Sequence, residues 1–142
     1  MIRCRSTAFR RILSEYSYQG YLFGRPDKLH FIADHPEEAA MIHPCFRNPV
    51  WEKNCGKCRK CSRDMLMIYA DGMTDRFSEA FDFGGFEKKI PTFLASAMVM
   101  GDELNLGTLK YWTQKGLPIP KKTYVYAERF RAAMKNLEEN GA

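Results

Sequence analysis

The 142-residue sequence lacks any apolar run of about 20 residues, the length that a helix needs to cross a bilayer. Its longest candidate, IPTFLASAMVMG at 90–101, is too short and is typical of a buried helix. The basic N-terminal segment MIRCRSTAFRRILSEY lacks the apolar stretch of a secretory signal peptide. We therefore expect no membrane partner, and a cytoplasmic location is the default expectation.

Familiar catalytic arrangements are also absent. The sequence has only three histidines, no Ser-His-Asp order and no paired carboxylates near a histidine. Asp34 and His35 are neighbours, but cap and turn roles explain both. Internal repeats and low-complexity linkers are missing too, so we expect one domain, or one domain with a short appendage. No complete catalytic site is visible, which argues against a self-contained enzyme.

The net charge of +5 is unevenly distributed. Residues 1–63 carry twelve Lys and Arg against six Asp and Glu, whereas residues 64–142 carry ten against eleven. The positive charge thus precedes and surrounds the cysteines. Such asymmetry is a weak indication of an anionic partner.

Hydrophobic periodicity favours a mostly α fold with a short β element near the N-terminus. GYLFG at 20–24 and LHFIA at 29–33 resemble strands, and RPDK at 25–28 resembles a turn between them. Thr74 is the expected cap of a short helix, while Pro91 and Gly101 are the expected start and stop of another. The pattern predicts helices over residues 6–18, 35–43, 62–73, 74–85, 91–100, 106–116 and 121–140.

Four of the five cysteines fall within seventeen positions, as Cys45-x9-Cys55-x2-Cys58-x2-Cys61. Two residues between cysteines let both thiolates bind one ion, and Gly56 suits the turn that this requires. Four thiolates in a tetrahedral arrangement are typical of structural zinc, with no position left open for water. The spacing therefore predicts a zinc clamp over residues 45–61.

Other interpretations of the cysteines remain open at this point. Three cysteines spaced by two residues also occur in iron–sulfur motifs, although here the fourth cysteine comes earlier and no Cys-Pro follows. A redox dithiol and a set of ordinary buried thiols are further alternatives. His43 could replace a ligand, but a surface or cap role is favoured. Cys4 is expected to be a free thiol.

Basic residues surround the cysteines. Zinc with four thiolates carries a charge of −2, which neighbouring cations can offset; an anion-binding role is the alternative. Trp51, between the first two cysteines, is expected to pack over the metal loop rather than to contact a ligand. The cations are Lys53, Lys57, Arg59, Lys60 and Arg63.

The motif also carries a family resemblance over roughly residues 20–85. It is similar to the C-terminal zinc-binding part of the 7-cyano-7-deazaguanine synthase group, within the PP-loop ATP pyrophosphatases. It is closer still to relatives with an NCG-x-C-x-K-C-x-R signature. Phe46 after the first cysteine and MTDRFSEAFDF at 73–83 add to the resemblance. The signature residues here are Asn54, Cys55, Gly56, Cys58, Lys60, Cys61 and Arg63.

The resemblance implies an enzyme that adenylates a carboxylate with ATP and then uses ammonia to form an amide and finally a nitrile. That chemistry depends on a Ser-Gly-Gly-x-Asp-Ser type loop that holds the pyrophosphate. The present sequence has no such loop, and its nearest glycine pair, Gly84–Gly85, is expected to be a turn. ATP would therefore be a cofactor only if a partner supplies the loop.

Taken with the resemblance, the sequence predicts two parts. Residues 1–34 would be a helix and short strands resembling the end of a PP-loop sheet, which a protein partner would complete. Residues 35–142 would be a helical zinc-binding domain. The predicted function is a zinc-stabilised accessory or remnant module of an ATP-dependent amidating enzyme. Arg25, Lys28 and Arg63 are weak candidates for contact with an anionic substrate.

A second prediction is a zinc-knuckle protein that binds nucleic acid or acts as a scaffold. The basic first half supports it, because aromatic side chains interleaved with arginines can stack on bases while the arginines hold phosphates. The aromatic residues are Tyr16, Tyr18, Tyr21, Phe46 and Trp51.

Overall fold

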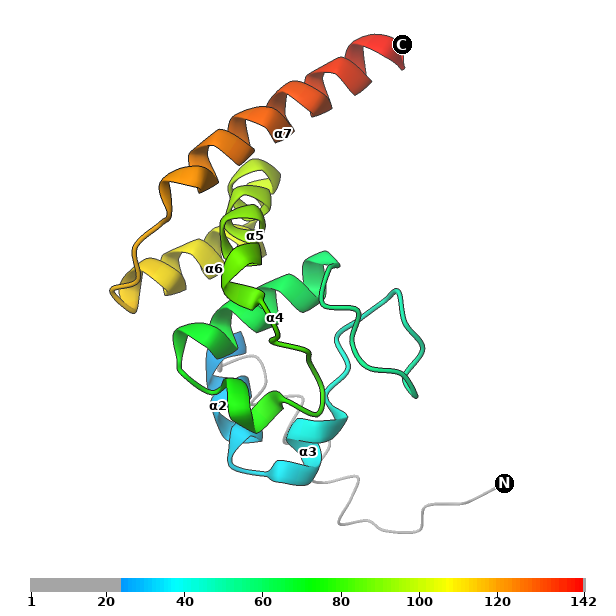
Figure 1. Ribbon diagram of the computed structural model, residues 1–142, viewed down its shortest axis with the longest axis vertical. Coiled ribbons are helices and arrows are strands. Elements are labelled where there is room, and N and C mark those ends of the chain that lie inside the picture. Colours follow the sequence, from blue (N-terminus) through cyan, green and yellow to red (C-terminus); the bar gives the residue numbers. More distant parts are fainter. Residues whose placement is uncertain (1–23, 142) are drawn as a thin grey trace.

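The computed structural model describes residues 24–141, and within that range the regular structure is entirely helical (Figure 1). This confirms the helical part of the predicted fold class. The elements are α2 (Arg25–Ala33), α3 (Pro36–Met41), α4 (Arg59–Ala70), the 3-10 helix η1 (Thr74–Phe77), α5 (Phe86–Met100), α6 (Glu103–Gln114) and α7 (Lys121–Asn140).

The strand expected at 29–33 is wrong, because this segment is the second half of α2. The turn expected at 25–28 is wrong as well, since it forms the first turn of the same helix. The Asp27 carboxylate accepts a hydrogen bond from the Gly24 amide at 2.9 Å and so caps the helix start. Leu29 and Ala33, four residues apart, form the buried face. A short apolar run is compatible with either a strand or one face of a helix. Here the Asp27 cap favours the helix.

Two other N-terminal expectations cannot be compared with the structure. The helix at 6–18 lies outside the described residues, and so does the strand at 20–24 except for Gly24, which precedes α2.

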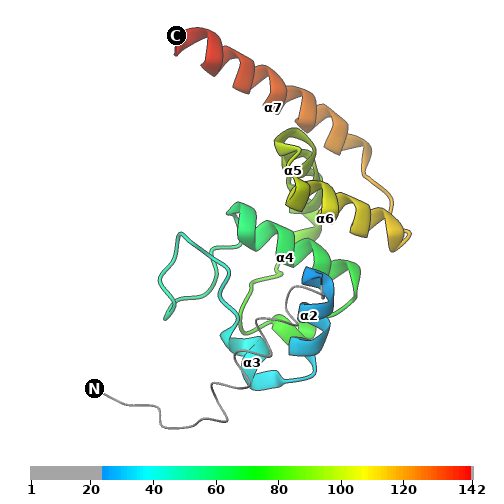
Figure 2. The same cartoon turned by 180° about the vertical axis from the view of Figure 1, so that it is seen from behind.

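Helix α4 is the centre of the molecule (Figures 1 and 2). It lies between α2 and α3 on one side and the α5–α7 group on the other. Its residues Met65, Leu66, Met67 and Ile68 are all buried, as the nearly continuous apolar sequence predicts. The helix starts at Arg59, three residues before the predicted start, because the Cys58 sulfur caps it by accepting a hydrogen bond from the Cys61 amide.

Two predicted helix starts beyond α4 need correction. Thr74 is the first residue of η1 rather than a side-chain cap. Pro91 lies inside α5, which begins five residues earlier at Phe86 after the left-handed Gly85. Phe86 is buried against Tyr69, with 5.4 Å between ring centroids, so aromatic packing adds turns before the proline.

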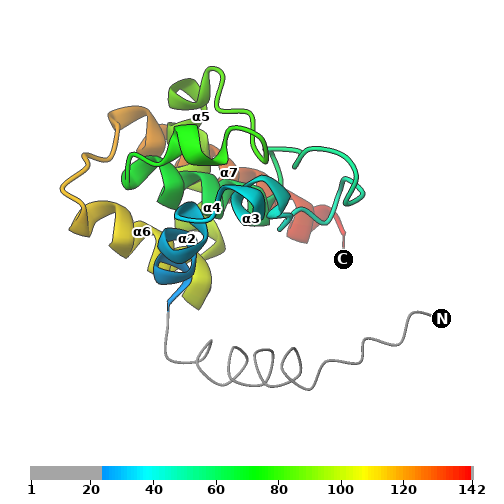
Figure 3. The ribbon, with the colours of Figure 1, turned by 90° about the horizontal axis from the view of Figure 1, so that it is seen from below.

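The last two helices follow the sequence pattern more closely. α6 starts at Glu103 because Asp102 caps the Asn105 amide, at 3.0 Å. α7 has the predicted bounds and packs along α5, and its C-terminal half extends beyond the body (Figure 1). The α6–α7 connection and the loop after α3 lie on opposite sides of α4 (Figures 1 and 3). None of the described helices is long and apolar enough to cross a membrane.

A buried carboxylate ties three of these helices together. Asp71 follows α4, and its side chain is only 1% exposed. His30 of α2 lies 2.9 Å from one carboxylate oxygen, Lys115 after α6 lies 2.7 Å from the other, and the Tyr111 hydroxyl donates to both. Three partners satisfy the carboxylate away from water, so Asp71 fixes α2 and α6 against the end of α4.

Candidate metal centre

The four cysteines come from an irregular loop and from the start of α4. Cys45 lies in the loop after α3, and Cys55 lies near the end of that loop. Cys58 is the N-cap residue of α4, and Cys61 lies in its first turn. Gly56 has a φ angle of 63°, a left-handed conformation that glycine adopts without strain, so the chain turns sharply between the second and third cysteines.

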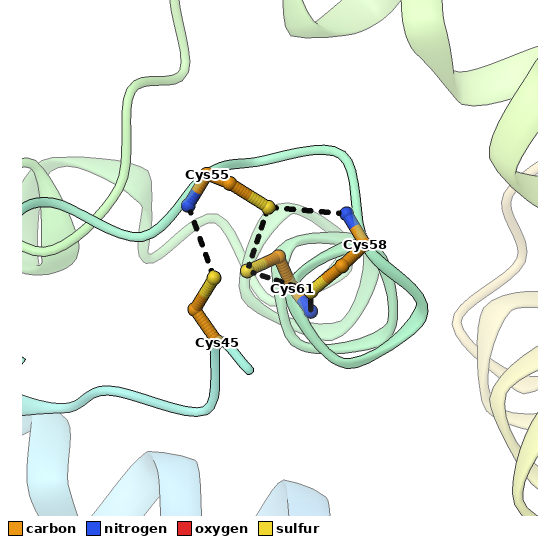
Figure 4. A group of neighbouring side chains, drawn as sticks. All are labelled: Cys45, Cys55, Cys58 and Cys61. Atoms are coloured by element: carbon orange, nitrogen blue, oxygen red, sulfur yellow. Dashed lines mark hydrogen bonds between the residues drawn. The ribbon is translucent and has the colours of Figure 1, made fainter. Parts of the chain in front are cut away.

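The structure brings all four cysteine sulfurs together, within 4.8 Å of one another (Figure 4). The Sγ atoms of Cys58 and Cys61 are 3.3 Å apart, and those of Cys55 and Cys61 are 3.9 Å apart. Four sulfurs at about 2.3 Å from one zinc ion would be about 3.8 Å from each other. The spacing therefore fits one ion at the centre of the four sulfurs.

Backbone amides point at the sulfur atoms in a repeated pattern. The Cys45 sulfur accepts hydrogen bonds from the amides two and three residues later, at 3.4 and 3.3 Å. The Cys55 sulfur accepts bonds from the same two offsets, also at 3.4 and 3.3 Å. The amides of Cys55 and Cys61 donate to the sulfurs of Cys45 and Cys58, each at 3.5 Å. These donors stabilise thiolate charge before any ion is considered.

The pKa values of the cysteines indicate which thiols the protein ionises more easily without a metal ion. Burial would raise the pKa of Cys45, but the loop amides lower it to about 6. Burial also opposes ionisation of Cys58, and the Cys61 amide helps bring its pKa below the ordinary value. The pKa of Cys61 is raised by burial and by its hydrogen bond with Cys58. Four thiolates this close therefore require a cation among them.

A buried asparagine holds the loop in place. Asn54, 6% exposed, accepts a hydrogen bond from the Cys45 amide at 3.2 Å. Its side-chain nitrogen donates to the carbonyls of Ile42 and Ala80, both at 2.9 Å. One side chain thus joins both ends of the loop to the segment after η1. The NCG motif contains this residue, but the spacing argument assigned it no role.

The sequence also suggested roles for two neighbours of the cysteines, His43 and Trp51. His43 is half-buried and does not belong to the four-sulfur cluster, and its buried Nε2 atom finds no partner among the described residues. Trp51 is 83% exposed, so the expectation that it packs over the metal loop is wrong. Cys4 lies outside the described residues.

The anion-binding candidates separate clearly. Arg25 forms a two-pronged ion pair with Asp64, with Nη2 and Oδ2 2.6 Å apart and Nε bonded to Oδ1. The pair uses Nε and Nη2 while the side chain stays 43% exposed, so Arg25 has a structural partner and its contact with a substrate stays a prediction. Lys28 is exposed on α2 and is not part of the four-sulfur cluster. Arg63 lies on α4, half-buried and near the cysteines in sequence.

Asp64 is a site that the sequence reasoning missed. Its side chain is fully buried, and burial raises its pKa while the bound Arg25 counters that rise. The pKa of Arg25 is raised by the same hydrogen bond. The signal in the sequence was an acidic residue inside the apolar run SRDMLMIYA, because an acidic side chain is rarely buried without a partner. The pair joins α2 to the helix that carries Cys58 and Cys61.

Comparisons of the chain with protein-family models, with curated proteins and with solved structures find no match.

Proposed function

We propose that the four cysteines bind one structural Zn²⁺ ion. The supporting observation is the convergence of four sulfurs within 4.8 Å, with backbone amides already directed at them. A cluster of several irons needs space for the irons and their bridging sulfides, which four sulfurs at this spacing do not leave. With four protein ligands the ion has no open position, so it would fasten the loop to α4 rather than activate water.

We further propose that the chain is a zinc-stabilised accessory or remnant module of an amidating enzyme of the PP-loop type, working with a partner that supplies the ATP-binding loop. The support is the NCG-x-C-x-K-C-x-R signature, in which each cysteine joins the cluster and Asn54 fastens the loop. Gly84 and Gly85 form a turn before α5, as expected, and not a loop between a strand and a helix. The chain's own part would be to present a folded surface to that partner.

Elemental analysis of the purified protein tests the metal, with one zinc per chain expected. Iron, or no metal in a well-folded protein, would contradict the proposal. Affinity purification of the tagged chain from its native host tests the partner. We expect a co-purifying protein with a Ser-Gly-Gly-x-Asp-Ser loop, and conversion of ATP to AMP and pyrophosphate only when both proteins are present. ATP consumption by the partner alone, unchanged by this chain, would count against the second part.

A further inference from the structure

A basic pocket lies beside the candidate metal centre, where α4 and α6 both begin. It has a volume of about 400 Å³. Three of its lining side chains are cations and one is a carboxylate, so its charge is positive on balance. We call this the basic pocket, and its lining residues are Phe46, Arg59, Lys60, Arg63, Asp102 and Leu104.

Arg63 is the least satisfied cation of the pocket. Its Nε atom is buried and has no hydrogen-bond partner among residues 24–141. A buried donor without a partner costs free energy, about 1–3 kcal/mol, and more when the group is charged. Arg25, by contrast, is paired with a buried carboxylate. The Nε atom itself is closed to solvent, but Arg63 also lines the basic pocket, so the rest of its guanidinium is the part that an incoming anion would contact.

The metal centre does not use up the local positive charge. Four thiolates with one Zn²⁺ carry −2, against five cations at positions 53, 57, 59, 60 and 63. Lys53 is turned elsewhere, since its ammonium donates to the Ser78 carbonyl at 3.0 Å. Asp102 caps α6, with its two oxygens 3.0 and 2.5 Å from Asn105 nitrogens, but it keeps its negative charge, which interacts with Arg63 and offsets one of the four remaining cations. A surplus of positive charge thus remains for a ligand.

Two exposed apolar side chains also line the pocket. Phe46 is 57% exposed and Leu104 is 62% exposed. The Lys60 ammonium stands 5.9 Å from the centre of the Phe46 ring, a cation–π distance. An exposed aromatic ring next to cations matches a nucleotide, whose base stacks while its phosphate binds the charges. A bare inorganic anion would leave both apolar walls unused.

We propose that the basic pocket binds one nucleotide unit of a single-stranded nucleic acid, with the base against Phe46 and the phosphate against Arg63 and Lys60. Arg47 follows Phe46 directly in the sequence and is exposed, so it adds a further cation next to the pocket and favours a polyanionic chain over a free nucleotide. This inference does not depend on the amidating function. It needs the metal only to hold Phe46 and Arg59 in position.

The test uses the full zinc-loaded chain and a fluorescein-labelled oligothymidylate of about 12 nucleotides, followed by anisotropy from low to moderate salt. Arg63→Gln and Lys60→Gln should each weaken binding about tenfold, and each should reduce the slope of log K against log salt by about 0.7. Phe46→Leu should weaken binding about tenfold at an unchanged slope, because it removes stacking and no charge.

Arg131→Gln, an exposed arginine of α7, is the matched control and should keep wild-type affinity and slope. Zinc content and helical circular dichroism of every variant separate loss of the pocket from loss of the fold. Since Lys60 and Phe46 are exposed, their variants keep the test valid even where Arg63→Gln fails to fold. The proposal would be overturned if the protein did not bind the oligonucleotide at low salt. It would also be overturned if the protein bound ATP but not the oligonucleotide. Equal losses in Arg131→Gln would overturn it too.

Discussion

The loop that carries Cys45 and Cys55 and the helical body around α4 are stabilised in different ways. The loop leaves Val50 77% and Trp51 83% exposed, and its described contacts are mostly hydrogen bonds to sulfur and to Asn54. The body buries its large apolar side chains instead, among them Phe77, Phe81, Phe86, Leu94 and Ile68. The loop therefore depends on directional hydrogen bonds and on the proposed ion, whereas the body depends on apolar burial.

This contrast has a consequence for metal removal. A chain of this size buries enough apolar surface to fold around its own core, unlike a small zinc finger that is unfolded without metal. Loss of the ion should therefore release the loop and the start of α4 first. The helices that pack on the far side of α4 should respond less.

Cys58→Ser should give the largest effect, because it removes one of the four sulfurs of the proposed zinc site, while the serine hydroxyl can still cap α4. We expect zinc content to fall from one per chain to near zero. Solubility and melting temperature should fall as well, and protease cleavage within residues 46–53 should become rapid. Elemental analysis, thermal unfolding and mass spectrometry of the cleavage products measure these outcomes.

Cys4→Ser is the matched control, since it removes the one cysteine outside the spaced motif. It should keep the metal and the melting temperature. Metal loss in this variant would mean that the ligand set has been assigned wrongly. Cleavage spread evenly over the whole chain in Cys58→Ser would show that the loop and the body form one cooperative unit, against the contrast drawn above.

Leu94→Ala should reverse the pattern. Leu94 is fully buried in α5, and truncation of such a side chain costs about 2–5 kcal/mol of unfolding free energy. The zinc content should stay at one per chain, because the residue is not part of the cluster. Leu137→Ala, at a site 74% exposed on α7, is the control and should cost about 0.5 kcal/mol or less. Denaturant unfolding measures the loss of stability, and elemental analysis measures the zinc content. Metal loss in Leu94→Ala would show that the loop and the body are not stabilised separately.

The contrast also explains what the sequence could predict. The cysteine spacing identified the cluster because two-residue spacing fixes local geometry that few other structures need. The bounds of α7 and the stop at Gly101 followed from periodicity and from glycine's left-handed conformation. These features depend on residues close together in the sequence, so they can be predicted from it.

The errors came from tertiary effects. Residues 29–33 form a helix because the Asp27 cap and the buried Leu29 outweigh the strand-like composition. α5 begins before Pro91 because aromatic packing at Phe86 extends it. The partners of Asp64 and Asp71 lie 39 and 40 or more residues away along the chain, and no periodicity encodes such pairings.

Asn54→Ala should weaken the loop without removing a ligand. The change leaves the Cys45 amide and two carbonyls without their buried partner, and we expect a loss of about 2 kcal/mol. Zinc should remain bound but exchange faster with a chelator, which competition with a chromophoric chelator measures. Asn48→Ala, which removes one exposed hydrogen bond to the Lys53 carbonyl, is the control. Equal exchange rates in the two variants would argue that Asn54 does not fasten the loop.

Asp71→Asn tests the body by charge instead of by volume, and it should have the smallest effect. Burial raises the pKa of Asp71, but Lys115 and Tyr111 hold it below its usual range. Loss of the charge should cost about 1–2 kcal/mol at neutral pH, a modest value because His30 and Lys115 are partly exposed and water screens them.

The direction of the pH dependence follows from the lowered pKa of Asp71. A carboxyl whose pKa is lower in the folded state contributes stability above its unfolded pKa of about 4, and that contribution disappears as the pH falls through the folded value. The stability difference between wild type and Asp71→Asn should therefore be present at pH 5 and shrink below about 4. Acid also protonates the cysteines, but equally in both proteins, so denaturant unfolding of the pair cancels that effect. Asp75→Asn, which changes an exposed side chain of η1, should show no such difference. A wild-type advantage that grows as the pH falls below 5 would mean that the Asp71 charge opposes folding.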